Sequence, residues 1–295
     1  MPSVKLKNYL LLHLIVFIWG FTAVLGKLIT IDALPLVWYR MVLATTLIFF
    51  YIKYKKLSLD VSRKGLLWMV VGGITIALHW VTFFMAIKVS NVSVTLATMS
   101  TAAFFTAILE PIWYGRKVVI YEIAFGLIVI MGLYIIFQVE TDYLYGIVLA
   151  LISAFLSVVF TLINGRLITY QKPSVISFYE LGSGVLFLTV FMIFRGDFTI
   201  GFFTLSPADW IFIGILASIC TAYAYIASVK VMRYITPYTV VLTVNLEPVY
   251  GIILAFFILG DDEKMKPEFY FGALIIILTV IANGVMKQID VKKNG

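Results

Sequence analysis

Four ionisable side chains stand inside long apolar runs of this chain, namely Arg40, His79, Glu180 and Glu247. A charged group in apolar surroundings costs several kcal/mol unless it is paired or hydrated, so each is a candidate for a functional role. An arginine and an acid at one depth can bind each other or a substrate that bridges them. A histidine can exchange a proton near neutral pH. No metal-ligand spacing accompanies these residues, because the only other histidine, His13, lies far away in the sequence.

The chain that must position these groups is 62% hydrophobic and 13% charged, with a mean hydropathy of +1.06. Soluble domains are about half apolar and about a quarter charged, so we expect lipid as the main solvent here. The net charge of +7 predicts no nucleic-acid partner, because basic loops beside membrane spans produce the same excess. Cys220 is the only cysteine, which excludes an intramolecular disulfide, and no cofactor is predicted.

The apolar runs have the length of membrane spans. A hydrocarbon core about 30 Å thick needs roughly 20 helical residues. On that scale the sequence predicts an all-α polytopic membrane protein with ten transmembrane helices, near 8–29, 33–52, 65–88, 92–113, 118–138, 143–166, 173–195, 208–231, 236–259 and 268–287. The first run is expected to be a retained span, because it is longer than a signal core and no A-x-A cleavage site follows it.

The loop charges predict the orientation of these spans. With the N-terminus in the cytoplasm, most lysines and arginines fall on the inner side, including those at 53–56, 63–64, 116–117 and 230–233. The outer loops mix a few basic residues with most of the acids. The positive-inside bias therefore predicts a multi-pass protein of the cell membrane with both termini cytoplasmic.

The two halves of the chain, 1–140 and 141–295, carry related segments. Glu122-Ile-Ala-Phe-Gly126 matches Glu268-Phe-Tyr-Phe-Gly272, and Ser100 falls opposite Asn245. Each half holds five predicted spans, and because five is odd the second half must enter from the opposite face. The sequence therefore predicts two inverted five-helix repeats, an arrangement that secondary transporters use with a substrate site near the midplane.

The order and spacing of short patterns resemble the EamA family of the drug/metabolite transporter superfamily over essentially the whole chain. The matching residues are Trp19-Gly20-Phe21, Lys27, Pro35, Arg40 and Ala44, then 86–93, then Leu246-Glu247-Pro248-Val249, Leu259-Gly260, Asp262-Glu263 and Gly272. One departure is Arg116-Lys117 after Gly115, where the family pattern has an acid. The resemblance implies a ten-helix carrier, usually an exporter of amino acids, related metabolites or drugs. It also implies a central cavity within spans one to four and six to nine, with spans five and ten outside.

Depth decides which charges can meet. Arg40 lies about seven residues from the outer end of its span, and Glu180 lies about seven residues from the inner end of its own. At about 1.5 Å per residue each is about 10 Å from its face of a hydrocarbon core about 30 Å thick, which leaves about 10 Å of depth between them. We therefore expect no direct pair between them. Glu247 lies near the midplane and closer to Arg40. The sequence predicts an Arg40–Glu247 pair or a substrate that bridges the two, while a purely structural pair is an equal alternative. Pro248 is expected to interrupt its helix, as a kink or as part of a site.

Besides His79, five further residues are candidates for lining the cavity, namely Trp80, Trp19, Tyr223, Tyr225 and Asn245. His79 could carry protons, but hydrogen bonding to a neighbouring helix is the commoner role of such a histidine. The aromatic residues could equally serve packing or the interfacial belt, because aromatics make up 16% of the chain. Two acidic segments have simpler interpretations: Glu110 is expected to reach interfacial water, and the acids at 261–263 are expected to form a solvated outer loop.

These patterns together predict a secondary transporter that exports amino acids or related small metabolites by alternating access, energised by a gradient of protons or of the substrate itself. The partners expected are the lipid bilayer and a small-molecule metabolite, and the protein could be a monomer or a homodimer. The alternatives are an integral membrane enzyme, for which no G-x-S-x-G or H-E-x-x-H pattern is found, and a receptor or scaffold, for which no output domain is found.

Overall fold

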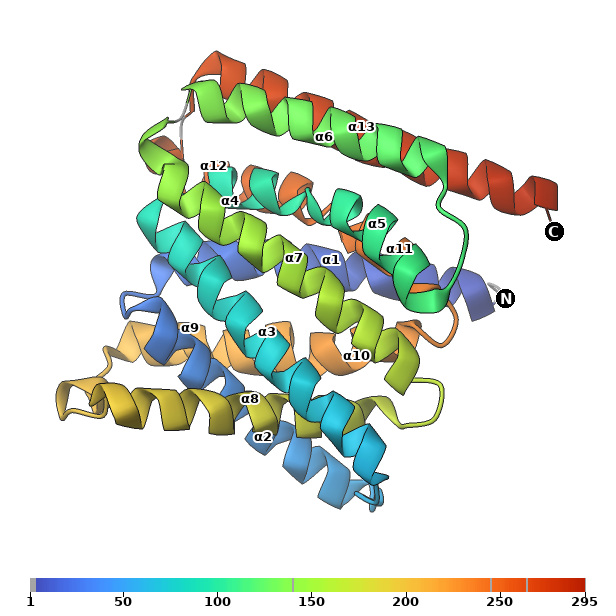
Figure 1. Cartoon of the computed structure of the whole chain (residues 1–295). Coiled ribbons are helices and arrows are strands. Elements are labelled where there is room, and N and C mark those ends of the chain that lie inside the picture. Colours follow the sequence, from blue (N-terminus) through green and yellow to red (C-terminus); the bar gives the residue numbers. More distant parts are fainter. Residues whose placement is uncertain (1–3, 140, 245, 264, 295) are drawn as a thin grey trace.

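The computed structural model of the chain describes residues 4–139, 141–244, 246–263 and 265–294. Within these ranges the chain is helical and contains no strand, which confirms the all-α class (Figure 1). Apolar helices of this kind satisfy their backbone hydrogen bonds internally, which is what a segment needs in a medium without water.

The first half of the chain contains α1 (Val4–Leu28), α2 (Ala33–Tyr54), α3 (Arg63–Val89), α4 (Val92–Met99), α5 (Ala102–Tyr114) and α6 (Ile120–Val139). The second half contains α7 (Leu144–Leu167), α8 (Pro173–Arg195), α9 (Pro207–Ala217), a π-helical turn (Ser218–Tyr223), α10 (Ala224–Val231), α11 (Pro237–Val244), α12 (Glu247–Leu259) and α13 (Pro267–Asn294). Short 3₁₀ turns lie at Thr141–Tyr143, Gly201–Phe203 and Gly260–Glu263.

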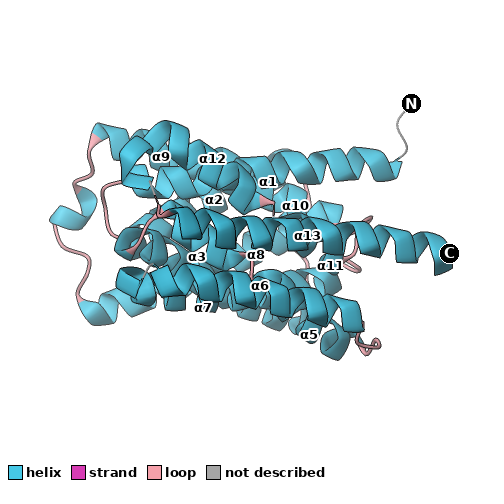
Figure 2. Ribbon diagram, turned by 90° about the horizontal axis from the view of Figure 1, so that it is seen from above, coloured by secondary structure: helices cyan, strands magenta, loops and turns pink. Residues whose placement is uncertain are grey.

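Seven of the described stretches are long and apolar enough to cross a membrane. They are Leu6–Leu28, Ala33–Tyr54, Arg63–Val89, Val92–Tyr114, Leu144–Leu167, Pro173–Arg195 and Pro207–Val231. Three shorter apolar stretches accompany them, at Ile120–Ile136, Glu247–Leu259 and Pro267–Asn283. The chain is therefore a polytopic membrane protein, whose helices form one bundle in which α3 and α7 run obliquely to α1 and α8 (Figure 1, Figure 2).

The helices α6 and α13 lie side by side as an outer pair (Figure 1, Figure 2). Glycines allow their close approach, since a Cβ atom on Gly272 would lie 2.8 Å from the carbonyl oxygen of Gly132. The larger apolar core belongs to the other helices, with fully buried residues such as Leu36, Phe84 and Leu216. Both ends of the described chain lie at the same end of the bundle (Figure 1).

Two membrane-length segments are broken in the middle. One break separates α4 from α5, and the other separates α11 from α12, at places that the sequence repeat pairs. In the second break Pro248 stands at the start of α12, where its missing N–H removes the bond to the preceding turn. The predicted interruption at Pro248 is confirmed.

The expectation of a solvated acidic loop at 261–263 is wrong for Glu263. This side chain is buried, and its carboxylate accepts hydrogen bonds from the backbone N–H groups of Val92 and Ser93 at 3.0 and 2.9 Å. The hydroxyl of Ser93 donates a third bond at 2.8 Å. The first N–H groups of a helix have no partner within it, and here a distant acid caps α4.

The expectation that Glu110 reaches interfacial water is also wrong. Glu110 is buried and forms an ion pair with Arg116, which also lies 3.4 Å from the carboxylate of buried Glu122. The residue that departs from the family pattern thus supplies a cation to two buried acids at the α5–α6 turn. Burial lowers the pKa of Arg116, but the two acids outweigh that effect and raise the pKa above its usual value.

Candidate functional site

A cavity of about 80 Å³ lies inside the bundle, between α1, α2, α3, α4, α5, α7, α10, α11 and α12. Aromatic side chains form much of its wall, together with two methionines, several hydroxyl groups and two charged residues. The lining includes Trp19, Trp80, Phe83, Phe160, Tyr225, Met99, Met232, Thr22, Ser157, Thr161, Ser228, His79, Arg40 and Glu247. The site is therefore apolar with a few polar groups, as ligand pockets generally are.

Arg40 is the cation of this cavity and is only 1% exposed. Its Nε donates to the hydroxyl of Thr221 at 2.6 Å, and its guanidinium carbon lies 3.9 Å from the centre of the Trp80 ring. The Nη1 atom is buried without a hydrogen-bond partner. A buried donor of this kind is costly unless a partner is supplied, so Arg40 is suited to bind an anionic group.

The π-helical turn at Ser218–Tyr223 holds two cavity residues in place. The extra residue in such a turn alters the regular ladder of backbone bonds. The indole Nε1 of Trp19 donates to the carbonyl oxygen of Cys220 at 3.2 Å, and the hydroxyl of Thr221 donates to the carbonyl of Leu216 at 2.7 Å. Trp19 and Arg40 are therefore both anchored on this turn.

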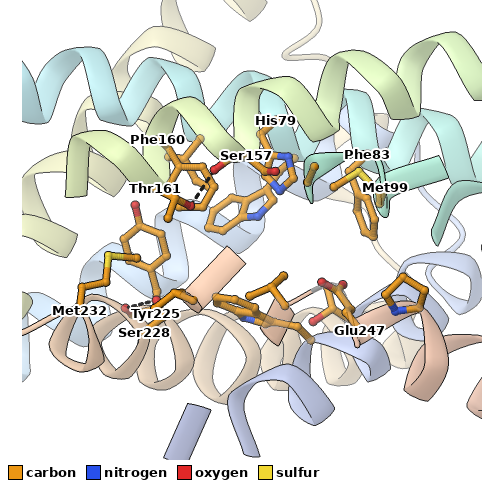
Figure 3. Close-up of a pocket in the computed structure, with 18 of the residues that line it drawn as sticks. His79, Phe83, Met99, Ser157, Phe160, Thr161, Tyr225, Ser228, Met232 and Glu247 are labelled. Atoms are coloured by element: carbon orange, nitrogen blue, oxygen red, sulfur yellow. Dashed lines mark hydrogen bonds between the residues drawn. The ribbon is translucent and has the colours of Figure 1, made fainter. Parts of the chain in front are cut away.

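Glu247 is the acidic residue of the cavity. It is half-buried at the start of α12 and points into the open space from the side opposite His79 and Phe83 (Figure 3). Among the residues that the structure describes, no ion pair within 4.0 Å joins Glu247 to Arg40. The direct form of the predicted pair is thus not made, although both residues line the same cavity.

His79 bonds to a neighbouring helix, the simpler of its two predicted roles. Its Nδ1 lies 2.9 Å from the carbonyl oxygen and 2.8 Å from the hydroxyl of Ser153 on α7. Since a carbonyl only accepts, Nδ1 carries the proton in the first contact. The ring of His79 also lines the cavity.

Glu180 lies beside the cavity and does not line it. It is fully buried and accepts hydrogen bonds from the hydroxyl of Tyr225 at 2.6 Å and from Nδ2 of Asn164 at 3.1 Å. As expected, no direct pair with Arg40 is found among the described ion pairs.

Tyr223 must be removed from the candidate set. It is 49% exposed and does not contribute to the cavity wall, whereas Tyr225 does. Residues two apart on a helix point to different faces, and only the packing shows which face is inside. Asn245, the remaining candidate, lies outside the described residues.

Several residues of the site carried no signal in the sequence. The role of Thr221 depends on the π-helical turn, for which hydropathy gives no indication. Ser157 and Thr161 were identifiable in principle, because hydroxyl groups four residues apart share one face of a helix, and Figure 3 shows them together on the cavity wall.

The chain belongs to the EamA-like transporter family, whose model matches residues 6–138 and again 144–284. It is therefore a membrane transporter. A protein of Archaeoglobus fulgidus named as an uncharacterized transporter is 25% identical over 285 residues, which cover 93% of this chain and 96% of the relative. Uncharacterized transporter YxxF of Bacillus subtilis is 22% identical over 235 residues, which cover 77% of this chain and 72% of the relative.

A solved crystal structure of a protein shares the fold. The superposition has a TM-score of 0.70 at 13% sequence identity and covers 96% of this chain and 98% of the other. At that identity the similarity shows the fold alone and gives no information about the substrate.

Proposed function

We propose that this transporter is a secondary carrier that exports amino acids or related small amphipathic metabolites through the cavity between its two halves. The observation that carries the proposal is the pairing, in one aromatic cavity, of an Arg40 Nη1 atom without a hydrogen-bond partner and a Glu247 carboxylate without an ion pair to Arg40. The substrate replaces a direct pair by bridging the two groups.

The chemistry of the cavity suits a zwitterion with an apolar portion. Nη1 of Arg40 would bind the carboxylate, Glu247 would bind the ammonium group, and Trp19, Trp80 and Phe83 would contact the apolar portion. Charge-assisted hydrogen bonds are about twice as strong as neutral ones and gain further where water is excluded. His79 faces the same space and could contact a polar group of the substrate.

The proposed architecture has ten crossings in two inverted repeats, 1–140 and 141–295. Three observations support it: the family model matches the two halves separately, each half contains one broken helix, and α6 and α13 form a matched outer pair. An even number of crossings fits two chain ends at one end of the bundle. The loop charges support the cell membrane as the location, with both termini cytoplasmic.

The size of the cavity supports transport by alternating access. A volume of about 80 Å³ is well below the ~300–1,000 Å³ of typical ligand pockets, so a metabolite can enter only when helices separate. The broken segments α4–α5 and α11–α12 border the cavity. We expect the helices to move at these breaks when the substrate enters.

Counterflow in liposomes tests the proposal. Vesicles containing the purified protein and loaded with unlabelled amino acids are given pooled radiolabelled amino acids outside. We expect saturable uptake, with an apparent affinity at least about tenfold weaker in Glu247→Gln, because a hydrogen bond to a charged group contributes about 1.5–3 kcal/mol. Glu268→Gln is the matched control, since Glu268 is exposed on α13.

Two results would contradict the proposal. Unchanged uptake in Glu247→Gln would remove this residue from the binding site. No saturable uptake from any pool, with folded protein, would exclude amino acids as the substrate class.

A further inference from the structure

The carboxyl group of Glu180 is held by neutral donors from two other helices. Its two oxygens accept from Tyr225 on α10 and Asn164 on α7, at 2.6 and 3.1 Å. Backbone packing closes a further side, because a Cβ atom added to Gly72 on α3 would lie 2.4 Å from Glu180 Oε1. The side chain has no exposed surface. Water is therefore excluded from this group in the present arrangement of helices.

The cation-forming groups that α2 and α3 place at the cavity are engaged elsewhere. Arg40 on α2 is directed to Thr221 and Trp80, and His79 on α3 is directed to Ser153. Neither forms an ion pair with Glu180 in the described part of the chain.

The remaining helices around Glu180 supply no cation either. On α10 the titratable neighbour is the phenol of Tyr225, while Lys230 is exposed. On α7 the neighbour is the amide of Asn164, and Arg166 is exposed. A carboxylate stripped of water and left without a cation is very costly, and binding a proton removes that cost.

Tyr225 connects Glu180 to the cavity. Its ring lines the cavity and stacks on Phe160 with a centroid distance of 6.2 Å, while its hydroxyl donates to Glu180. One phenol group thus separates the carboxyl from the space assigned to the substrate. A change in the cavity that moves Tyr225 must also change the hydrogen bonding of Glu180.

The contact between α3 and α8 controls access of water to Glu180. A Cβ atom added to Gly73 would lie 2.1 Å from the carbonyl oxygen of Glu180, so the two backbones are in close contact at this residue. Separation of these two helices would expose the carboxyl to water.

We propose that Glu180 is a proton-binding site that couples proton movement to transport. The proton resides on the carboxyl while α3 and α8 are in contact. When they separate toward one side of the membrane, the proton passes to the water there and leaves a hydrated carboxylate. The carboxylate takes a proton from the water on the other side before the contact forms again, so each cycle moves one proton across the membrane. Tyr225 remains protonated, and its hydrogen bond to Glu180 changes when the cavity changes. The coupling rests on the proposed function, whereas the proton site does not.

Infrared difference spectroscopy over a pH titration of the whole protein tests the site without any substrate. We expect the carbonyl band of a protonated, buried carboxyl group that is present at neutral pH and is lost in Glu180→Gln. Glu247→Gln is the matched control and should retain the band. A spectrum at neutral pH in which Glu180→Gln removes no such band would overturn the proposal.

Tyr225→Phe provides a second test if Glu180→Gln does not fold. Loss of the hydroxyl donor should shift the same band to higher frequency, because the carboxyl then has one hydrogen bond fewer. An unshifted band in the folded variant would contradict the assignment to Glu180.

Transport assays distinguish the coupling to protons from the transport of the substrate itself. With pooled labelled amino acids, Glu180→Gln should lose the accumulation driven by a pH gradient while retaining counterflow, which needs no net proton movement. Accumulation that stays at the wild-type level would refute the coupling. If the wild-type protein shows no counterflow, the proposed substrate class fails, and the infrared result still decides the proton site.

Discussion

The Nε atom of Arg40 donates a 2.6 Å hydrogen bond to the hydroxyl of Thr221, across 181 residues of sequence. This contact joins α2 to the π-helical turn and fixes the direction of the guanidinium group. Trp80 holds the face of that group at 3.9 Å, so the free Nη1 atom has a defined position. The binding of an anion therefore depends on a residue that is itself absent from the cavity wall.

Thr221→Val should weaken substrate binding while leaving the maximal rate largely unchanged. Valine has a similar shape but leaves the buried N–H of Arg40 without an acceptor, which costs about 1–3 kcal/mol. We expect an apparent affinity reduced about fivefold or more in liposome counterflow.

Thr221→Ser is the matched control and should behave like the wild type, because the hydroxyl is retained. Equal loss in Thr221→Ser and Thr221→Val would show that the methyl group, not the hydrogen bond, matters at this position.

Glu263→Gln should lower the thermal stability of the protein in detergent. The carboxylate caps α4 through three hydrogen bonds to Val92 and Ser93, and a neutral amide replaces a charged acceptor with a weaker one. We expect a loss of about 1–2 kcal/mol, measured as a lower unfolding temperature. Glu268→Gln, on an exposed side chain, should leave the unfolding temperature unchanged; a similar fall in both variants would argue against the capping role.

Gly73→Ala should destabilise the protein, because its Cβ atom would lie 2.1 Å from the backbone oxygen of Glu180 and force α3 and α8 apart. Overpacking of this kind costs about 1–3 kcal/mol. Gly214→Ala is the control, since nothing lies within 4 Å of the added atom and alanine favours the helix by about 0.5–1 kcal/mol. Unfolding temperatures that fall for Gly73→Ala and do not fall for Gly214→Ala would match the packing; the opposite order would not.

Arg116→Ala should destabilise the α5–α6 turn more than Lys117→Ala does. Removal of Arg116 takes the cation from the ion pairs with buried Glu110 and Glu122, whereas Lys117 is exposed. Because Arg116 is itself partly exposed, we expect a loss of about 1–3 kcal/mol, less than for a fully buried pair. Limited proteolysis of this turn, together with the unfolding temperature, measures the effect. Equal behaviour of the two variants would mean that the acids are stabilised by other contacts.

The sequence by itself determined the class of the protein. Hydropathy sums over neighbouring residues, so the apolar segments could be located from composition and length alone, and the seven described stretches long enough to cross a membrane lie where spans were expected. The family patterns are likewise local. They identified the transporter family. Arg40, Glu247 and His79, as ionisable residues in apolar runs, and Trp19 and Trp80, as aromatic candidates, are residues that the structure brings to one cavity.

Only the tertiary structure decided which face of each helix is inside and which distant groups meet. Tyr223 and Tyr225 are equivalent in the sequence, yet packing turns the second toward the cavity and leaves the first exposed. In the sequence Glu263 resembles an acid of a solvated loop. Only the structure shows that it contacts the start of α4, 170 residues away. Such contacts depend on the rotation and relative position of whole helices, which arise from many packing interactions at once and leave no local pattern in the sequence.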